Sequence, residues 1–425
     1  MSFEKISVVG LGYIGLPTAA VFASRKKIVI GVDVDQKAVD TINRGEIHIV
    51  EPDLDIVVHA AVTEGYLKAT ITPEPADAFL IAVPTPFKDD HEPDLKYIEA
   101  ATKSIAPVIK SGDLVVLEST SPVGTTEKMA EWLSDARPDL TFPQDMGSES
   151  DIRVAHCPER VLPGSVLREL VQNDRVIGGM TSRCSAAAID LYKIFVTGDC
   201  LVTNARTAEM AKLTENSFRD VNIAFANELS MICDKLSIDV WELIALANRH
   251  PRVSILQPGP GVGGHCIAVD PWFIVSKNRE EAKLIHTARL VNDEKPSWVL
   301  QKVHQTIGKI LTDNPEKTVR DISVACFGLA FKPNIDDLRG SPALNIAVEV
   351  SKLLPGNVFA IEPNIDHLPT VCSETLKLTD VSEIQNVDIL LILVKHKELD
   401  EIDIQGLNCH LIDTVGFSRE RSSHG

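Results

Sequence analysis

The chain has 425 residues, of which 44% are hydrophobic, and a formal net charge of −18. This length is greater than a single hydrophobic core can support, so we expect two or three domains. The acidic charge argues against nucleic acid or an anionic membrane as a partner, because both require a basic protein surface. No apolar run is long enough to cross a membrane. The closest of the eight cysteines, Cys184 and Cys200, are 16 residues apart, which excludes the spacing of a zinc motif. Scattered cysteines of this kind predict reduced thiols in a metal-free cytoplasmic protein.

In the first 200 residues, short β-rich runs alternate with helical patterns. This alternation predicts a parallel sheet wrapped by helices. We expect its strands at residues 6–9, 28–32, 78–83, 114–117, 154–157 and 175–177.

A glycine motif follows the first expected strand and opens a helix. It reads GxGxxG at Gly10, Gly12 and Gly15, and Asp33 ends the next strand. The first glycine allows the turn, the second lets the backbone approach a pyrophosphate, and the third lets the helix pack on the strand. Asp33 would accept from the adenosine ribose and repel a 2′-phosphate. The motif therefore predicts a dinucleotide site that prefers NAD to NADP.

Further polar groups lie where ligands bind in open α/β sheets, at the start of the first helix and at the carboxyl ends of later strands. The amides of Tyr13 and Ile14 would face the phosphates. The hydroxyls of Thr85, Thr120 and Thr126 are candidates for hydrogen bonds to ribose, nicotinamide or an ordered water. The alternative is ordinary turn and capping chemistry.

The loop 157–164 follows another expected strand. Glu159 is a candidate general base for water, Arg160 a candidate phosphate ligand, and Val161 a candidate substrate contact. The alternative is a surface loop with an ion pair.

Residues 199–250 contain neither glycine nor proline, which predicts two long helices, with Asp239 capping the second. Such a helical region offers a natural dimer surface. Lys212, Asn216 and Arg219 share one face at helical spacing. We expect the first helix to be largely buried, and a buried lysine beside an asparagine can stabilise an oxyanion. The alternative is a solvated polar stripe.

A glycine- and proline-rich loop spans residues 252–271 and holds Gly263, Cys266 and Asp270. Glycines let a backbone approach a ligand closely, and a cysteine presented there can act as a nucleophile that holds an acyl group. The alternative for Cys266 is a small buried hydrophobic side chain. His265 is expected to be a neighbour in the loop rather than the base.

Downstream, a helical region at about 280–312 precedes a second α/β pattern. It has expected strands at 323–328, 358–361 and 389–394, a helix at 342–353 and a frayed polar end. Four basic residues flank the two loops 250–271 and 328–342 and are candidates for binding a diphosphate, with surface charge as the alternative: His250, Arg252, Lys332 and Arg339.

Taken together, these motifs resemble, in order and over almost the whole chain, the UDP-glucose/GDP-mannose 6-dehydrogenase family. The resemblance implies an α/β fold of two Rossmann-like doubly wound domains joined by a long central helical region. We expect an NAD domain at 1–200, a helical dimerisation region with the cysteine loop at 201–312, and a UDP-sugar domain at 313–425.

The resemblance also implies roles for individual residues. Cys266 matches the nucleophile and Lys212 the lysine at the oxyanion. Asn216 and Asp270 match its hydrogen-bonding partners, and Glu159 matches the acid tied to thioester hydrolysis.

Other roles concern the ligands. Thr120 matches a threonine near the reacting carbon, and Arg252 an arginine that reaches a neighbouring subunit's sugar nucleotide. Lys332 and Arg339 match residues at the diphosphate and the cofactor. Val269 departs from the family, because enzymes acting on UDP-glucose often carry a lysine there.

The resemblance implies a four-electron oxidation at C6 of UDP-N-acetyl-D-mannosamine through a thiohemiacetal and a thioester on Cys266, which water activated near Glu159 or Asp270 then hydrolyses. UDP-N-acetyl-D-glucosamine and UDP-glucose are the alternative substrates. A two-electron dehydrogenase of the hydroxyacid type, or a non-catalytic nucleotide-sugar binder, would not need Cys266.

Overall fold

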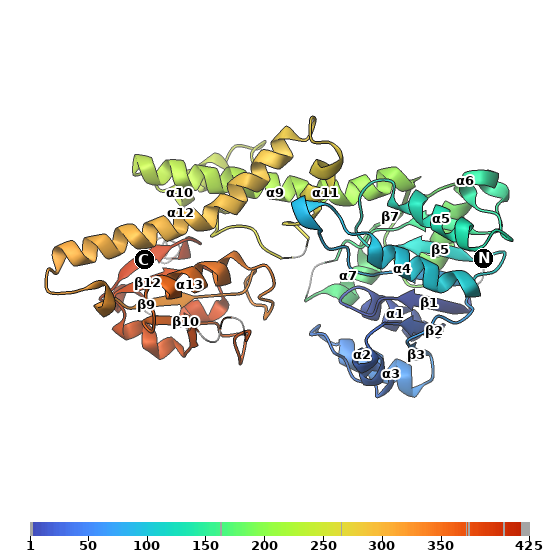
Figure 1. Cartoon of the computed structure of the whole chain (residues 1–425), viewed down its shortest axis with the longest axis horizontal. Helices are drawn as coiled ribbons and strands as arrows, with labels where there is room; N and C mark the ends of the chain where they lie inside the picture. The colour runs from blue at the N-terminus through green and yellow to red at the C-terminus, as the bar shows by residue number, and fades with distance from the viewer. Residues whose placement is uncertain are drawn as a thin grey trace. The chain divides into compact units, whose positions relative to one another are not determined.

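The computed structural model describes residues 3–161, 164–264, 266–370, 372, 375–402 and 404–417. It divides into two compact units, Met1–Glu215 and Asn216–Gly425 (Figure 1). The boundary falls inside the longest helix, α9 (Ala205–Leu236), so this helix contributes to both units.

The first unit is built on an eight-stranded sheet in the order β3-β2-β1-β4-β5-β6-β7-β8. Its first six positions have the 3-2-1-4-5-6 order of a dinucleotide-binding fold. The strands are β1 (Lys5–Val9), β2 (Ile28–Val32), β3 (Leu67–Thr70), β4 (Ala78–Ile81), β5 (Leu114–Leu117), β6 (Arg153–His156), β7 (Arg175–Gly179) and β8 (Cys200–Asn204).

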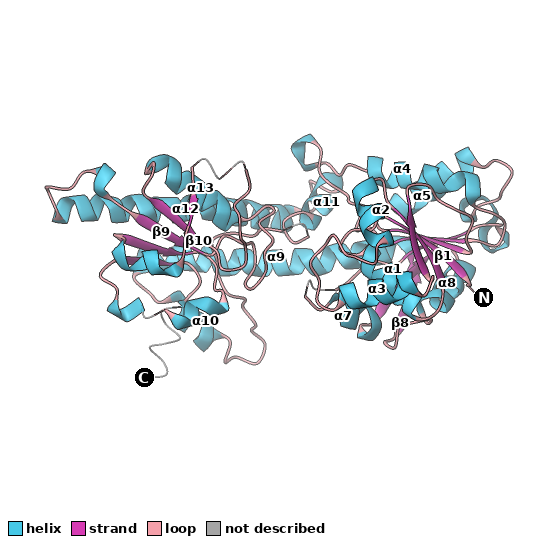
Figure 2. Cartoon of the chain, turned by 90° about the horizontal axis from the view of Figure 1, so that it is seen from below, coloured by secondary structure: helices cyan, strands magenta, loops and turns pink. Residues whose placement is uncertain are grey.

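Helices cover both faces of this sheet (Figure 2). One hydrophobic cluster packs α1, α3, α7 and α8 on one face, and another packs α4 and α5 on the opposite face. The α-helices are α1 (Gly15–Ser24), α2 (Gln36–Asn43), α3 (Leu54–Thr63), α4 (Lys96–Ile105), α5 (Thr125–Ala136), α6 (Pro143–Met146), α7 (Val166–Gln172) and α8 (Ser182–Tyr192). Short 3₁₀ helices lie at η1 (Asp89–His91), η2 (Ala106–Val108) and η3 (Gly147–Glu149).

The six strands expected for this unit are present, with ends shifted by at most two residues. Two features differ from expectation. The sheet is not wholly parallel, because β6 and β7 pair antiparallel through Ala155–Gly179 and His156–Gly178. The stretch 199–250 is not helical from its start, because Cys200–Asn204 forms strand β8 on the edge of the sheet.

The second unit contains a parallel five-stranded sheet in the order β11-β10-β9-β12-β13. Helices α12 and α13 pack on one face, while short 3₁₀ segments and Phe417 cover the other. The strands are β9 (Val324–Phe327), β10 (Val358–Ile361), β11 (Lys377–Leu378), β12 (Ile389–Ile392) and β13 (His410–Asp413).

Apart from α11 (Asp270–Lys277), which lies where the sequence predicts no helix, the helices of this unit agree with the sequence-based expectation. Asp239 caps α10 by accepting from the backbone N–H of Trp241 at 3.0 Å, and α13 has the expected bounds. Besides α9, they are α10 (Val240–Ala247), α11 (Asp270–Lys277), α12 (Lys283–Asp313) and α13 (Pro342–Leu353), with 3₁₀ helices η4 (Val319–Asp321), η5 (Val381–Asn386), η6 (Lys397–Glu401) and η7 (Ile404–Gly406). Among the described residues, no helix is long and apolar enough to span a membrane. The expected frayed end, 417–425, lies almost wholly outside the described residues.

Candidate active site

The glycine motif of the first unit has the geometry of a nucleotide-binding turn. Gly10 has a φ of +92°, and a Cβ there would meet the Ala82 carbonyl oxygen at 2.6 Å. A Cβ at Gly15 would lie 1.7 Å from the Gly10 carbonyl oxygen, so the turn and the start of α1 leave no room for a side chain. A Cβ at Gly12 would meet nothing within 4 Å. This open position suits the close approach of a pyrophosphate.

Asp33 sits at the end of β2, next to this turn. Its carboxylate accepts from the backbone N–H of Leu11 at 2.8 Å and of Asp35 at 2.9 Å. Asp33 is half-buried. Directly before α1, Tyr13 is exposed and Ile14 is half-buried. The carboxylate therefore fixes the glycine turn against the end of β2.

Replacing Asp33 by alanine is expected to weaken NAD binding and to reduce the preference for NAD over NADP. The ribose acceptor and the repulsion of a 2′-phosphate are both lost, and the Leu11 N–H loses its acceptor. The kcat/KM ratio for the two cofactors measures the preference. Asp35→Ala, which removes a helix cap two residues away, is the matched control and should leave that ratio unchanged.

The threonines expected near the cofactor are used differently from one another. Thr85 donates to the carbonyl oxygen of Thr120 at 2.8 Å, which ties two loops together at the carboxyl ends of β4 and β5. Both threonines remain half-buried. Thr126 is fully buried, and its hydroxyl and N–H both donate to Glu209 at 2.6 and 2.7 Å. In this structure Thr126 therefore anchors the start of α5 on α9.

Glu159 lies in a buried ion-pair cluster that the sequence did not reveal. Its carboxylate is 2.9 Å from the guanidinium of Arg175, which is itself 3.7 Å from Glu118. Tyr192 donates to Glu118 at 2.6 Å. The sequence predicts Arg175 only as the first residue of a strand. The residues of β7 and α8 form no sequence pattern that indicates a buried charge between these two elements.

Next to Glu159, Arg160 pairs with Glu215 at 2.6 Å. Its guanidinium therefore already has a carboxylate partner, which a phosphate would have to displace. Val161 is half-buried, and residues 162 and 163 lie outside the described part of the chain.

Helix α9 presents its polar residues at different depths. Asn216 is buried, Lys212 is half-buried and Arg219 is exposed. The expectation that α9 is largely buried is wrong, because Phe218 is 68% exposed and Phe225 is 50% exposed. These aromatic residues lie on the face opposite the buried Asn227 and leave an apolar surface uncovered in the single chain.

Cys266 is exposed in the loop before α11. Asp270 begins that helix, is buried, and donates its backbone N–H to the Cys266 carbonyl oxygen at 2.9 Å. The Asp270 carboxylate accepts a short hydrogen bond from the Asn216 side chain. The structure thus fixes the aspartate and the asparagine together and leaves the thiol at the surface. His265 lies outside the described residues.

The loop that carries Cys266 is held by asparagine side chains that sequence reasoning missed. Asn227 accepts from the Gly259 N–H at 2.9 Å, and Asn222 accepts from the Leu256 N–H at 3.0 Å. Asn248 bonds both the N–H and the carbonyl of Ile255. Bonding to backbone groups at several points fixes the loop without secondary structure.

The glycines of the same loop pack closely on the loop 328–342. A Cβ at Gly263 would lie 2.5 Å from the Gly340 carbonyl oxygen, and one at Gly264 would lie 2.8 Å from the Phe331 ring. The two loops that the sequence singled out are therefore in contact, and these positions require glycine for packing.

The four basic residues at these loops are accessible to a ligand to different degrees. His250 and Arg252 are exposed and Lys332 is half-buried. Arg339 is exposed and forms a two-point contact with Asp337, at 2.8 and 2.7 Å. A diphosphate that uses Arg339 must therefore compete with Asp337.

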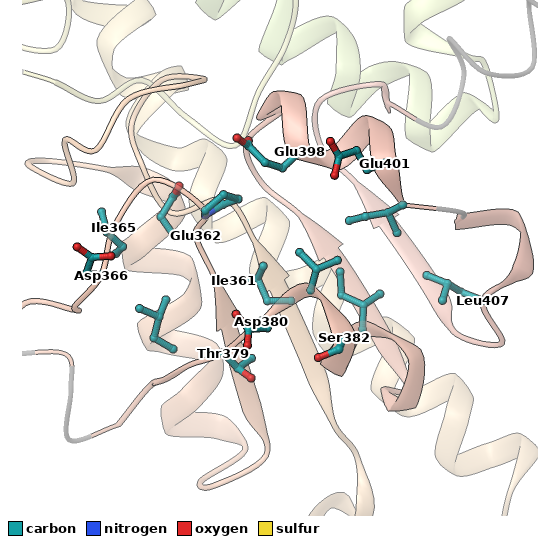
Figure 3. A pocket seen from close by; sticks show the side chains of 15 residues that line it. Ile361, Glu362, Ile365, Asp366, Thr379, Asp380, Ser382, Glu398, Glu401 and Leu407 are labelled. Carbon is teal, nitrogen blue, oxygen red and sulfur yellow. The ribbon is translucent and has the colours of Figure 1, made fainter.

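A hollow of about 1000 Å³ lies elsewhere in the second unit, beyond the ends of β10 and β11 (Figure 3). Five carboxyl groups line it, from the buried Glu362 and from Asp366, Asp380, Glu398 and Glu401. Such a wall repels phosphate groups. We therefore do not place the sugar nucleotide in this hollow.

Comparison with known proteins agrees with this arrangement. Profiles of the UDP-glucose/GDP-mannose dehydrogenase family match the chain with the NAD binding domain at residues 4–196, the central domain at 206–294 and the UDP binding domain at 325–416.

Individual relatives are similar over nearly their whole length. A UDP-N-acetyl-D-mannosamine dehydrogenase of Yersinia pestis is 63% identical over 421 residues, covering 99% of this chain and 100% of that protein. An NDP-N-acetyl-D-galactosaminuronic acid dehydrogenase of Ralstonia nicotianae is 62% identical, covering 98% and 97%. The structure of a UDP-D-ManNAc dehydrogenase from Pyrococcus horikoshii superposes with a TM-score of 0.85 at 36% identity, covering 97% and 95%. The chain therefore belongs to the UDP-glucose/GDP-mannose dehydrogenase family of NAD-dependent oxidoreductases.

Proposed function

We propose that this protein oxidises the C6 alcohol of UDP-N-acetyl-D-mannosamine to the carboxylate, with two molecules of NAD per sugar. The observation that carries the proposal is the exposed Cys266, placed before the buried pair of Asp270 and Asn216. A two-electron dehydrogenase needs no such thiol. The names of relatives at 62–63% identity support the substrate class.

Cofactor binding is assigned to the glycine turn, where Gly12 faces open space and Asp33 stands at the end of β2. When bound there, NAD would supply the hydride acceptor that both oxidation steps need. Thr85 and Thr120 are assigned to the nicotinamide side of that site, at the carboxyl ends of β4 and β5.

The protein's own groups carry the covalent chemistry. The Cys266 thiolate adds to the aldehyde carbon to give a thiohemiacetal, and its oxidation leaves a thioester on the same sulfur. Lys212 and Asn216, one helical turn apart on α9, are assigned to the oxyanion. Water then loses a proton to Glu159 as its oxygen adds to the thioester carbon, and the C–S bond breaks to release the acid and Cys266.

The diphosphate is assigned to Arg252, Lys332 and Arg339, with His250, Arg219, Arg160, Val161 and Gly263 as further substrate contacts. Arginine binds phosphate in a bidentate way, and most of these side chains lie at the surface of loops. Val269, where enzymes for UDP-glucose often carry lysine, supports an N-acetylated sugar over UDP-glucose. One specific observation favours a second candidate, the galacto isomer, because a relative named for that sugar is 62% identical.

A panel assay tests both the reaction and the sugar. We expect two NADH per sugar acid and no free aldehyde. When UDP-N-acetyl-D-mannosamine, its gluco and galacto isomers and UDP-glucose are compared, we expect the first to have the highest kcat/KM. A site that hydrogen-bonds the acetamide in one orientation should discriminate by about 10³-fold or more. One NADH per product would refute the thioester route, and a preference for another isomer would refute only the choice of sugar.

We also propose that the protein is a cytoplasmic homodimer and that α9 forms its interface. The proposed domains are those that the sequence indicates, at residues 1–200, 201–312 and 313–425. Phe218, Phe225 and Ile232 recur every seven residues on one face of α9 and are 68%, 50% and 46% exposed. An exposed apolar stripe of this kind marks an interaction surface. The proximity of Arg252 to a neighbouring subunit's substrate is part of the same proposal.

Replacing Phe225 by arginine is therefore expected to convert the dimer to a monomer, because a charge cannot be buried in an apolar interface without a partner. Sedimentation or light scattering at several protein concentrations measures the mass. The control is Tyr97→Arg on α4, which is 52% exposed and should leave the mass unchanged. A Phe225→Arg protein with the parent mass would exclude this face as the interface.

A further inference from the structure

The cluster around Glu159 contains a second carboxyl group for which the reaction described above has no use. Glu118 follows β5 at the carboxyl end of the sheet and is 1% exposed. It meets Tyr192 at 2.6 Å and Arg175 at 3.7 Å, and Arg175 lies 2.9 Å from Glu159. Arg175 also stacks on the Tyr192 ring, with its guanidinium carbon 4.6 Å from the ring centre.

The charges of this cluster do not balance if both carboxyls are ionised. Two carboxylates would face a single guanidinium in a space closed to water, which leaves one buried negative charge uncompensated. Such a charge is costly, and the cluster avoids it when one carboxyl keeps its proton.

The geometry identifies Glu118 as the carboxyl that keeps the proton. Glu159 has the closer approach to Arg175 and also accepts from the Arg160 N–H at 2.6 Å. Glu118 lies farther from the guanidinium, and its hydrogen bond comes from the uncharged Tyr192 hydroxyl. Burial raises the pKa of Glu118 to about 7, with Arg175 opposing and Glu159 adding to that effect.

The other groups packed around Glu118 keep a constant charge near neutral pH. Burial raises the pKa of the Cys157 thiol and of the Tyr192 phenol far above neutrality, so both stay protonated. Burial lowers the pKa of His156 to about 3, so that ring stays neutral. Arg175 stays charged.

We propose that Glu118 is a positioning residue that controls Glu159 through Arg175. While Glu118 carries its proton, Arg175 pairs with Glu159 and weakens it as a base. When Glu118 loses the proton, it competes for Arg175, and Glu159 becomes a stronger base for the water that hydrolyses the thioester. This inference rests on the proposed function, because it assumes that Glu159 activates that water.

The test is the pH dependence of thioester hydrolysis in Glu118→Gln. The step is followed by acid-quenching single turnovers and measuring, by intact-protein mass, the fraction of enzyme that carries the acyl group. In the parent enzyme the hydrolysis rate should rise about tenfold between about pH 6 and pH 8, as the ionised fraction of a group titrating near 7 does. In Glu118→Gln the rise should fall below about twofold, because that position can no longer ionise.

Two further variants separate this role from a merely structural one. Asp113→Asn changes another buried carboxyl group, which precedes β5 at the opposite end of the strand, and should keep the parent profile. Tyr192→Phe removes the hydrogen bond that favours ionised Glu118, and should move the rise to higher pH. A parent-like profile in Glu118→Gln would overturn the proposal, as would an unshifted profile in Tyr192→Phe.

The protonation itself has an independent readout in thermal unfolding. A carboxyl whose folded pKa lies above its unfolded value binds more protons in the folded state, so stability falls as pH rises through that window and levels off above the folded pKa. Glu118→Gln should therefore remove part of the loss of stability between about pH 4.5 and pH 7. If no acyl-enzyme forms in any variant, the proposed function and the role in hydrolysis both fail, while a change in unfolding would still establish the buried proton.

Discussion

Replacing Cys266 by serine is expected to abolish formation of the sugar acid, with a loss of more than about 10³-fold in turnover, while NAD and the sugar nucleotide still bind. A serine hydroxyl at neutral pH is a far weaker nucleophile than a thiolate and cannot hold the acyl group as a thioester. Product mass and NADH release measure turnover, and calorimetry measures binding. A labelling reagent such as iodoacetamide should react first with Cys266, which is exposed.

Cys157 provides the matched control because it lies two residues before Glu159, in the loop 157–164. It is completely buried, and burial raises the pKa of its thiol, so it has neither access nor thiolate character. Cys157→Ser should retain turnover and the same labelling pattern. Turnover that survives in Cys266→Ser and disappears in Cys157→Ser would reverse the assignment.

Replacing Asp220 by alanine is expected to lower the free energy of unfolding by about 3 kcal/mol. Asp220 on α9 pairs with Arg289 on α12 at 2.6 Å, and both side chains are buried. Burial raises the pKa of Asp220 despite Arg289, so the pair does not recover its whole desolvation cost. Removing one partner nevertheless leaves a buried guanidinium with Asp293 as its remaining partner.

Denaturant unfolding measures this loss of stability. Two further variants test whether the loss comes from the isolated buried charge. In the double variant Asp220→Ala, Arg289→Met, the isolated charge is gone, so stability should recover part of the loss. Lys352→Ala removes an exposed ion pair with Glu349 in the same unit and should change stability little. A single variant as stable as the parent would show that the pair contributes nothing.

The same substitution is expected to disturb the cysteine loop. Asp220 accepts from Asn292, which in turn accepts from Asn227, the residue that holds the Gly259 N–H. This chain of hydrogen bonds connects the helix pair to the loop that carries Cys266. Stability and loop position therefore depend on one buried polar network.

The sequence determined those features whose information is local. The glycines at 10, 12 and 15 with Asp33, and Cys266 with Asp270, act through turns and short spacings that neighbouring residues set. The central strands were predictable because they are buried on both faces and read as continuous apolar runs, such as Leu114–Leu117. Capping of α10 by Asp239 follows the same local logic.

Only the tertiary structure decided the edges of the sheets. The strands that the sequence did not reveal are β3, β8, β11 and β13, and each is an edge strand of its sheet. An edge strand pairs on one side and is partly exposed, as the burial of Cys200–Asn204 shows. Its residues therefore need no long apolar run, and its strand conformation is imposed by the neighbour to which it bonds.

The buried polar contacts were beyond the sequence for a related reason. Tyr192 and Glu118 are 74 residues apart, and Asn227 and Gly259 are 32 apart. No local pattern marks such pairs, because each side chain taken alone resembles an ordinary surface residue. Folding brings them together in a space without water, and there the need to satisfy every buried charge and hydrogen bond turns them into the groups that position the site.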